Sequence, residues 1–178
     1  MLKCFAIFAL AAAIPVCLAD SAAGINWTPP ASWKSLASRP MRAATYAVPA
    51  APGDKEDGEC AVYYFGPGQG GSVEANLERW TKQFEQTDGK PTSHPAQVKK
   101  RTIHGIAVTT VDVSGAYSGM GGPMAASKSV KPGYRLLGAI AEAPEGAVFF
   151  KFTGPAKTVT ANQANFEALV GSLKNGSK

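Results

Sequence analysis

The sequence predicts an α+β protein in which an antiparallel β-sheet of about six strands is covered by helices, as an α/β/α sandwich. Six segments are apolar or alternating runs bounded by turn residues, and two segments show the apolar spacing of amphipathic helices. Their order along the chain is strand, strand, helix, four strands, helix. Most neighbouring strands follow each other through short turns, whereas parallel pairs would need long crossovers. The sheet is therefore expected to be antiparallel.

The first 19 residues have the pattern of a secretory signal peptide. Lys3 precedes an apolar run that ends at Val16, and small residues lead up to Asp20. We expect cleavage near Ala19 and export to the periplasm or the medium, with a lipoprotein anchored at Cys17 as the alternative. The apolar run is shorter than the roughly 20 residues of a membrane span. No transmembrane segment is therefore expected in the mature chain.

The rest of the chain is expected to be one domain with a short lead-in. Residues 20–43 are interpreted as irregular, because Pro29 and Pro30 cannot lie inside a helix. Residues 44–178 are interpreted as a single globular α+β domain, and about 160 mature residues suffice for one hydrophobic core. We expect a monomer. The formal net charge of +5 falls by one when Lys3 is removed, so the mature protein is mildly basic.

The first half of the domain contains two expected strands and a helix. The strands cover 44–48 and 60–65 and are joined by the polar turn 53–58. A glycine-rich loop, 66–71, leads to a helix that Ser72 is expected to cap. The apolar side chains that share one face of this helix are Val73, Leu77, Trp80 and Phe84.

The second half contains four expected strands and the last helix. Strands 97–103 and 106–113 are joined near His104, and strands 134–141 and 147–153 form a hairpin. A Gly-, Ser- and Lys-rich segment, Ser114 to Gly133, separates the two pairs. A helix is expected from about Thr160 to Leu173, with Phe166 and Leu169 on its apolar face.

The end of the chain carries a family resemblance. The strand 147–153, followed by Gly154-Pro155 and an amphipathic helix, resembles the final strand, loop and helix of the PsbP/Mog1-like fold. The segments from Val62 to Trp80 and from Gly121 to Met124 look like those of a group of exported bacterial proteins of unassigned function. The resemblance implies an antiparallel sheet between helical layers. It implies no catalytic residue, because this fold carries unrelated functions.

Two glycine-rich loops are the candidate binding segments. The first gives Gln69, Gly70, Gly71 and Ser72 as candidate contacts, because free backbone N–H groups at a helix start attract anions and polar groups. Its Gly66-x-Gly68-x-x-Gly71 spacing lacks the parallel strand–helix–strand setting of a dinucleotide site. The second is the long segment Ser114 to Gly133, which contributes the candidates Tyr117 and Lys128.

An enzyme built on the single cysteine of the mature chain is the alternative. Cys60 could be combined with His104 and Asp112 as a thiol triad, although the cysteine lies in a strand-like run with no nucleophile motif. The two histidines lack the paired spacing of zinc ligands, so no zinc site is expected. The basic residues are scattered apart from Lys99-Lys100-Arg101, which excludes a typical nucleic-acid reader.

The sequence therefore predicts an exported, non-catalytic binding or accessory protein. Its partner would be a small ligand or a protein of the cell envelope, and no cofactor or metal is expected. The alternative is a small hydrolase or redox enzyme that uses the Cys60 thiol.

Overall fold

The computed structural model describes residues 19–85, 96–119 and 130–176. Its strands are β1 (Asp20–Ala22), β2 (Ile25–Trp27), β3 (Lys34–Ser35), β4 (Arg42–Val48), β5 (Gly58–Tyr64), β6 (Phe84–Glu85), β7 (Gln97–Ile103), β8 (Ile106–Tyr117), β9 (Lys131–Ala143), β10 (Gly146–Pro155) and β11 (Lys174–Asn175). Its helices are α1 (Val73–Thr81), α2 (Ala156–Ala161) and α3 (Gln163–Gly171). None of the described helices is long and apolar enough to cross a bilayer.

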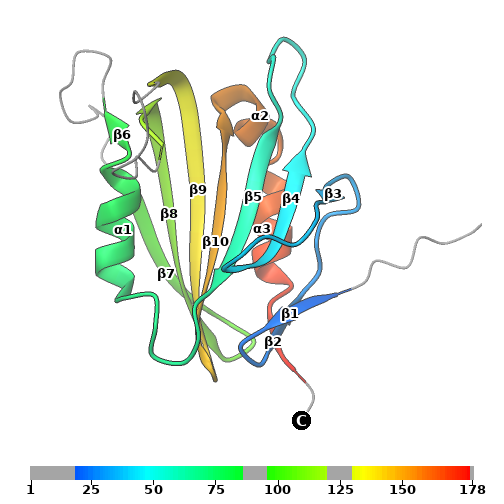
Figure 1. The fold of residues 1–178 in the computed structure, drawn as a ribbon, viewed down its shortest axis with the longest axis vertical. Helices are drawn as coiled ribbons and strands as arrows, with labels where there is room; N and C mark the ends of the chain where they lie inside the picture. Colours follow the sequence, from blue (N-terminus) through cyan, green and yellow to red (C-terminus); the bar gives the residue numbers. More distant parts are fainter. Residues whose placement is uncertain (1–18, 86–95, 120–129, 177–178) are drawn as a thin grey trace, which may run out of the picture.

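The strands form two antiparallel sheets (Figure 1), which confirms the α+β class. The main sheet has eight strands in the order β3-β4-β5-β10-β9-β8-β6, and β7 pairs with the other part of β8. The smaller sheet has the order β1-β2-β11. All six expected strands are present in the main sheet. The expectation of about six missed the short strands β3 and β6, because two-residue strands leave no periodic pattern.

Helices lie on both sides of the main sheet. In Figure 1, α1 lies in front of the β7 and β8 side, while α3 lies behind β5 and β4. Each therefore covers only part of its face, and the expected α/β/α sandwich is confirmed only in part. On the front face, no described helix lies over β5 and β4.

The alternation of side chains in β10 divides the hydrophobic core into two clusters. Phe150 and Phe152 are buried in the cluster that contains Phe166 of α3. Phe149 points to the other face, where it is buried in the cluster that contains Trp80 of α1. Because successive side chains of a strand point to opposite faces, one strand supplies apolar groups to both clusters.

Helix α1 begins where the sequence predicts and ends earlier. The Ser72 hydroxyl accepts a hydrogen bond from the Ala75 amide at 3.1 Å, so Ser72 is the expected N-cap. The helix stops at Thr81, and Phe84, expected on its apolar face, lies in β6 opposite Tyr117. Phe84 is still buried. Strand pairing with β8 therefore overrides the helical spacing, while the apolar side chain keeps its place in the core.

The last helical segment is two helices rather than one. The expected start at about Thr160 is late, because α2 begins at Ala156, and Asn162 separates α2 from α3. The Asn162 side chain donates to the Thr158 carbonyl at 3.1 Å and accepts from Trp33 Nε1 at 3.1 Å. The residue between the two helices thus accepts a hydrogen bond from Trp33, which lies far away in the sequence.

Residues 20–43, expected to be irregular, contain β1, β2 and β3 and the start of β4. Trp27 and Trp33 are buried in the core of the domain. The Trp27 indole donates to the Tyr46 hydroxyl at 2.8 Å, and that hydroxyl donates to the Asp20 carboxylate. Local sequence did not reveal these strands, because they are only two or three residues long.

The expected loop from Ser114 to Gly133 is shorter than predicted. Strand β8 continues to Tyr117 and β9 begins at Lys131, with a register shift between Gly115 and Tyr117. Both ends of the segment are therefore part of the sheet. Residues 120–129, which include the candidate Lys128, lie outside the described residues, as does most of the expected signal peptide.

Candidate functional site

A hollow of about 360 Å³ opens on the side of the main sheet that carries α1, and we call it the Lys151 pocket. It is assembled from strands that are distant in the sequence and adjacent in the sheet. Its lining side chains come from the end of the β4–β5 turn and from β4, β5, β8, β9 and β10. These residues are Arg42, Glu56, Asp57, Glu59, Ala61, Tyr63, Tyr117, Lys131, Tyr134, Lys151 and Thr153, together with Gly154.

Small residues beside Lys151 create the space. Lys151 pairs with Ala61 on β5 and with Gly138 on β9. Because the side chain of Ala61 is a single methyl group, the space above it on the β5 side stays unfilled. On the β9 side, Trp80 fills the space instead, since a Cβ added to Gly138 would lie 2.5 Å from Trp80 Cζ3. The pocket is therefore open over Ala61 and closed over Gly138.

Lys151 is a buried cation at the base of the pocket, with 5% of its surface exposed. Its ammonium donates to Gln83 Oε1 at 2.6 Å and to the Tyr117 hydroxyl at 3.4 Å. Among the described residues, no carboxylate lies within ion-pair distance of it. Burial lowers the pKa of Lys151 to about 8, with smaller contributions from the positive charges of Arg79 and Arg42.

The other two cations of the pocket are paired with carboxylates. Arg42 Nη1 donates to Glu59 Oε1 at 2.9 Å. Lys131 donates to Glu56, which also accepts from the Tyr134 hydroxyl at 2.6 Å. These pairs lie in more exposed positions than Lys151. Lys151 is therefore the one cation lining this pocket that the described residues leave without a carboxylate.

Aromatic rings form the walls. The rings of Tyr117 and Tyr134 are stacked, with centroids 5.7 Å apart and an interplanar angle of 4°. On the opposite wall, the Arg42 guanidinium lies 5.4 Å from the ring centroid of Tyr63. Burial raises the pKa of Tyr117 and of Tyr63, so both hydroxyls are protonated donors at neutral pH.

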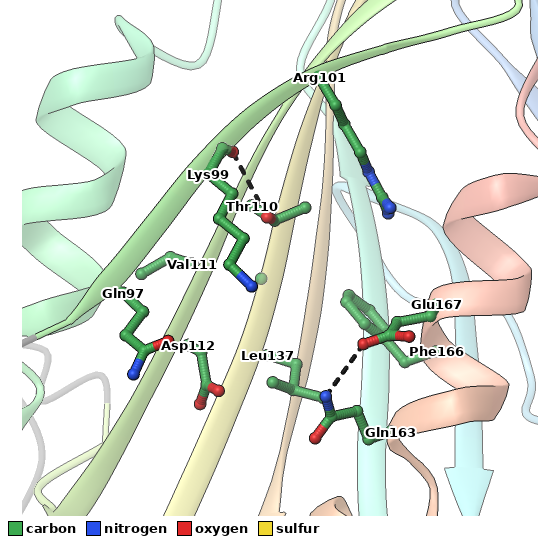
Figure 2. A pocket seen from close by; sticks show the side chains of 11 residues that line it. Gln97, Lys99, Arg101, Thr110, Val111, Asp112, Leu137, Gln163, Phe166 and Glu167 are labelled. Carbon is green, nitrogen blue, oxygen red and sulfur yellow. Dashed lines mark hydrogen bonds between the residues drawn. The ribbon is translucent and has the colours of Figure 1, made fainter.

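A second hollow, of about 320 Å³, lies on the other face between β7, β8, β9 and α3. Figure 2 shows Lys99 and Arg101 extending from β7 into it, opposite Gln163 and Glu167 of α3. Asp112 in this hollow is bound by Arg135 through bonds of 2.9 and 2.7 Å. Its two β7 cations are exposed. This hollow therefore lacks a buried charged group that an incoming ligand would complete.

The loop before α1 is closed by its own hydrogen bonds. The Asn76 amide donates to the carbonyls of Gly70 and Ser72, each at 2.8 Å. A Cβ on Gly70 would lie 2.7 Å from the ring of Phe149, so this glycine allows close packing. Gln69 is exposed. The candidates Gln69, Gly70, Gly71 and Ser72 are not part of the Lys151 pocket.

Of the sequence candidates, Tyr117 alone lines the pocket among those described, and it does so from a strand. Sequence reasoning missed Lys151, Arg42 and Tyr134. A signal for Lys151 was present, because it is the only charged residue in the apolar run from Val148 to Phe152. A charge inside such a run indicates a buried group that needs a partner.

The groups of the thiol alternative do not form a triad in this structure. Cys60 is fully buried, and burial raises the pKa of its thiol, which disfavours the reactive thiolate. Cys60 and Asp112 are separated by β10 and β9, which is about 14 Å at about 4.8 Å per strand. His104 Nδ1 lies 2.7 Å from the Leu173 carbonyl. Within the described ranges, no three His, Cys, Asp or Glu side chains gather as a metal site.

No family model and no curated protein sequence matches the chain. Solved structures do. LpqN, involved in cell envelope biogenesis of Mycobacterium tuberculosis, matches with 13% identity and a TM-score of 0.53, over 86% of this chain and 83% of LpqN. The cyanobacterial PsbP of Synechocystis sp. PCC 6803 matches with 12% identity and a TM-score of 0.51, over 93% of this chain and 98% of that protein.

The fold is PsbP-like. A Pseudomonas aeruginosa protein of unknown function also matches, with 13% identity and a TM-score of 0.49, over 86% of this chain and 92% of that one. At such identities, the PsbP-like architecture is shared without implying a shared site, so the function of this chain has to be argued from its own residues.

Proposed function

We propose that this protein is an exported, non-catalytic binding protein that holds a small ligand in the Lys151 pocket. The single observation that carries the proposal is the buried ammonium of Lys151, which lines an open hollow and has only the neutral partners Gln83 and Tyr117. A buried charge is unfavourable unless it is paired. A ligand that pairs with it has a physical reason to bind there.

The position of the pocket supports a binding role. It has the volume of small-molecule sites, which begin at about 300 Å³, and it combines aromatic walls with a few directed polar groups. Its floor is built on the paired strands β5, β10 and β9, which hold the lining side chains in fixed positions. Rigid strands of this kind fix a site more precisely than loops do.

Export is the second part of the proposal. The pattern of residues 1–19 favours release of a mature chain that starts at Asp20, in the periplasm or outside the cell. LpqN, which shares the fold, is described as involved in cell envelope biogenesis. A role in the envelope is consistent with both observations, and the mature domain would act as a monomer.

Native mass spectrometry of the mature protein, recovered from the compartment to which its host exports it, tests the proposal. We expect a non-covalent additional mass on the wild-type protein and its loss in Ala61→Phe, which fills the pocket floor. Lys99→Met, in the second hollow, is the control and should keep the additional mass. A bare wild-type protein contradicts the binding role, and an Ala61→Phe protein that still carries the mass contradicts the site.

A further inference from the structure

We infer that the Lys151 pocket takes a small aromatic monocarboxylate, whose carboxylate binds the Lys151 ammonium and whose ring lies between the tyrosine walls. This inference rests on the proposed binding role and adds the chemical class of the ligand. Three features of the pocket carry it: the charge that the described residues leave unpaired, the sign of the charges at the rim, and the residues that form the walls.

The ion pairs within the pocket leave one ammonium, that of Lys151, without a carboxylate partner among the described residues. Arg42 is paired with Glu59, and Lys131 with Glu56, so these cations are already neutralised. The Lys151 ammonium has the amide oxygen of Gln83 at 2.6 Å, which is a neutral acceptor. A carboxylate would give this ammonium a hydrogen bond in which both partners are charged, which is stronger than one to a neutral amide oxygen. The positive charges of Arg79 and Arg42 also act at this position, and the negative charge of Glu59 acts against them.

A second donor is placed for the same carboxylate. The Tyr117 hydroxyl lies 3.4 Å from Lys151 Nζ, so both groups can reach the two oxygens of one carboxylate. Burial raises the pKa of this hydroxyl and keeps it protonated as a donor. One ammonium and one hydroxyl at this spacing provide two donors for a bidentate acceptor.

The rim favours a single negative charge over two. The carboxylates of Glu56, Asp57 and Glu59 all line the same hollow. Asp57, the one of the three with no ion-pair partner among the described residues, would repel a dianion such as a phosphate monoester more strongly than a monoanion, because like charges disfavour each other at short range. A monocarboxylate satisfies Lys151 without placing a second charge near this rim.

The walls favour a planar ring. Tyr117 and Tyr134 stack on each other on one side, and Tyr63 lines the other. Aromatic side chains pack well against rings through offset or edge contacts. The floor is the methyl group of Ala61, which adds an apolar surface without filling the space. A ring that carries a carboxylate therefore matches both the walls and the base.

Paired probes test the inference. We would titrate the mature protein at pH 7 with 2-naphthoate, with its neutral amide 2-naphthamide and with inorganic phosphate, by isothermal calorimetry. We expect 2-naphthoate to bind at least about tenfold more tightly than either of the others, which is the range of one charged hydrogen bond. Lys151→Met should remove this preference, and Lys99→Met should keep it.

A second variant separates loss of the ligand contact from misfolding of the Lys151→Met protein. Tyr117→Phe retains the ring and the ammonium, and it should weaken 2-naphthoate by several-fold while leaving 2-naphthamide nearly unchanged. Equal binding of 2-naphthoate and 2-naphthamide, or tighter binding of phosphate, overturns the ligand class and leaves the binding role intact. Absence of 2-naphthoate binding also overturns it. The native mass experiment decides the binding role separately, because that measurement needs no assumed ligand.

Discussion

The Lys151 ammonium donates to Gln83 Oε1 at 2.6 Å, so the segment that follows α1 provides the nearest partner of the cation buried on β10. This contact joins the helix end to the centre of the sheet. It satisfies a hydrogen bond without neutralising a charge. Lys151 therefore has no carboxylate within ion-pair distance among the described residues, and the pH dependence of stability should report its burial.

Stability should rise between about pH 8 and pH 9 because of Lys151. Its pKa is lowered to about 8 in the folded protein from 10.5, so in this window the unfolded chain binds more protons than the folded one. The free energy of unfolding then increases with pH, by about 1 kcal/mol. Urea unfolding of wild type and Lys151→Met at both pH values checks this.

The rise should be absent in Lys151→Met and present in Lys99→Met. Above about pH 9, the tyrosines Tyr46, Tyr63, Tyr117 and Tyr134 act in the opposite direction, because their raised pKa values mean that the folded state keeps protons that the unfolded chain releases. The comparison therefore ends at about pH 9. An equal rise in the Lys151→Met protein would show that another group causes it.

Affinity for an aromatic carboxylate should fall as the pH increases above 8. The carboxylate binds the protonated form of Lys151, which is depleted above its pKa of about 8. Between pH 7 and pH 9, the apparent affinity for 2-naphthoate should fall by about tenfold. Calorimetry at the two pH values measures it, with 2-naphthamide as the probe whose affinity should stay constant.

Cys60 should react with iodoacetamide only after unfolding. Its side chain is fully buried and its thiol pKa is raised by burial, so both access and nucleophilicity are low. Ser72→Cys, at an exposed N-cap, gives a matched second thiol that should react in the native protein. Intact mass after a short exposure measures both. Rapid labelling of Cys60 in the native protein would instead support the alternative that the Cys60 thiol is catalytic.

Gly138→Ala should destabilise the fold through Trp80. The added methyl would lie 2.5 Å from Trp80 Cζ3 and 2.8 Å from Val111 Cγ1, closer than atoms can approach. Overpacking of this kind typically costs about 1 to 3 kcal/mol. Because Trp80→Ala removes the main clash, the double variant should be less unstable than the sum of the two single variants. Additive effects would mean that the ring does not press on this position.

Asp112→Asn should weaken the fold more than Glu78→Gln. Asp112 accepts two bonds from Arg135, and the arginine of this pair is mostly buried. Removing its charge should cost about 1 kcal/mol after allowance for partial exposure. Glu78 pairs with Lys82 on the open surface of α1, so its loss should hardly change the denaturant midpoint. Equal effects would place the Asp112 pair among the weak surface contacts.

The sequence was most informative where one element carries a repeating pattern. The six long strands and the Ser72 cap follow from alternation and from local hydrogen bonding, so they could be predicted. The end of α1 could not, because Phe84 is drawn into pairing with Tyr117, which lies 33 positions later in the sequence. The break at Asn162, where the indole of Trp33 binds, is likewise set by a contact across the fold.

The candidate site was harder to predict for the same reason. Lys151, Arg42 and Tyr134 come from three strands whose neighbours in the sheet are not their neighbours in the chain. The glycine-rich loops were predicted as binding segments because they interrupt the strand and helix patterns of the sequence. The charge in the apolar run around Lys151 was the better indicator, since its burial is the observation that demands an explanation.

The small sheet has a consequence for when the domain can be completed. Strand β2 lies between β1, which precedes the strands of the main sheet in the sequence, and β11, which follows them, and the Gly176 amide also donates to the Gly24 carbonyl at 2.8 Å. A chain that is made from its N-terminus therefore has one edge of β2 unpaired until β11 has emerged. Folding of this sheet should finish only then, and a chain truncated before β11 should be more open to proteases.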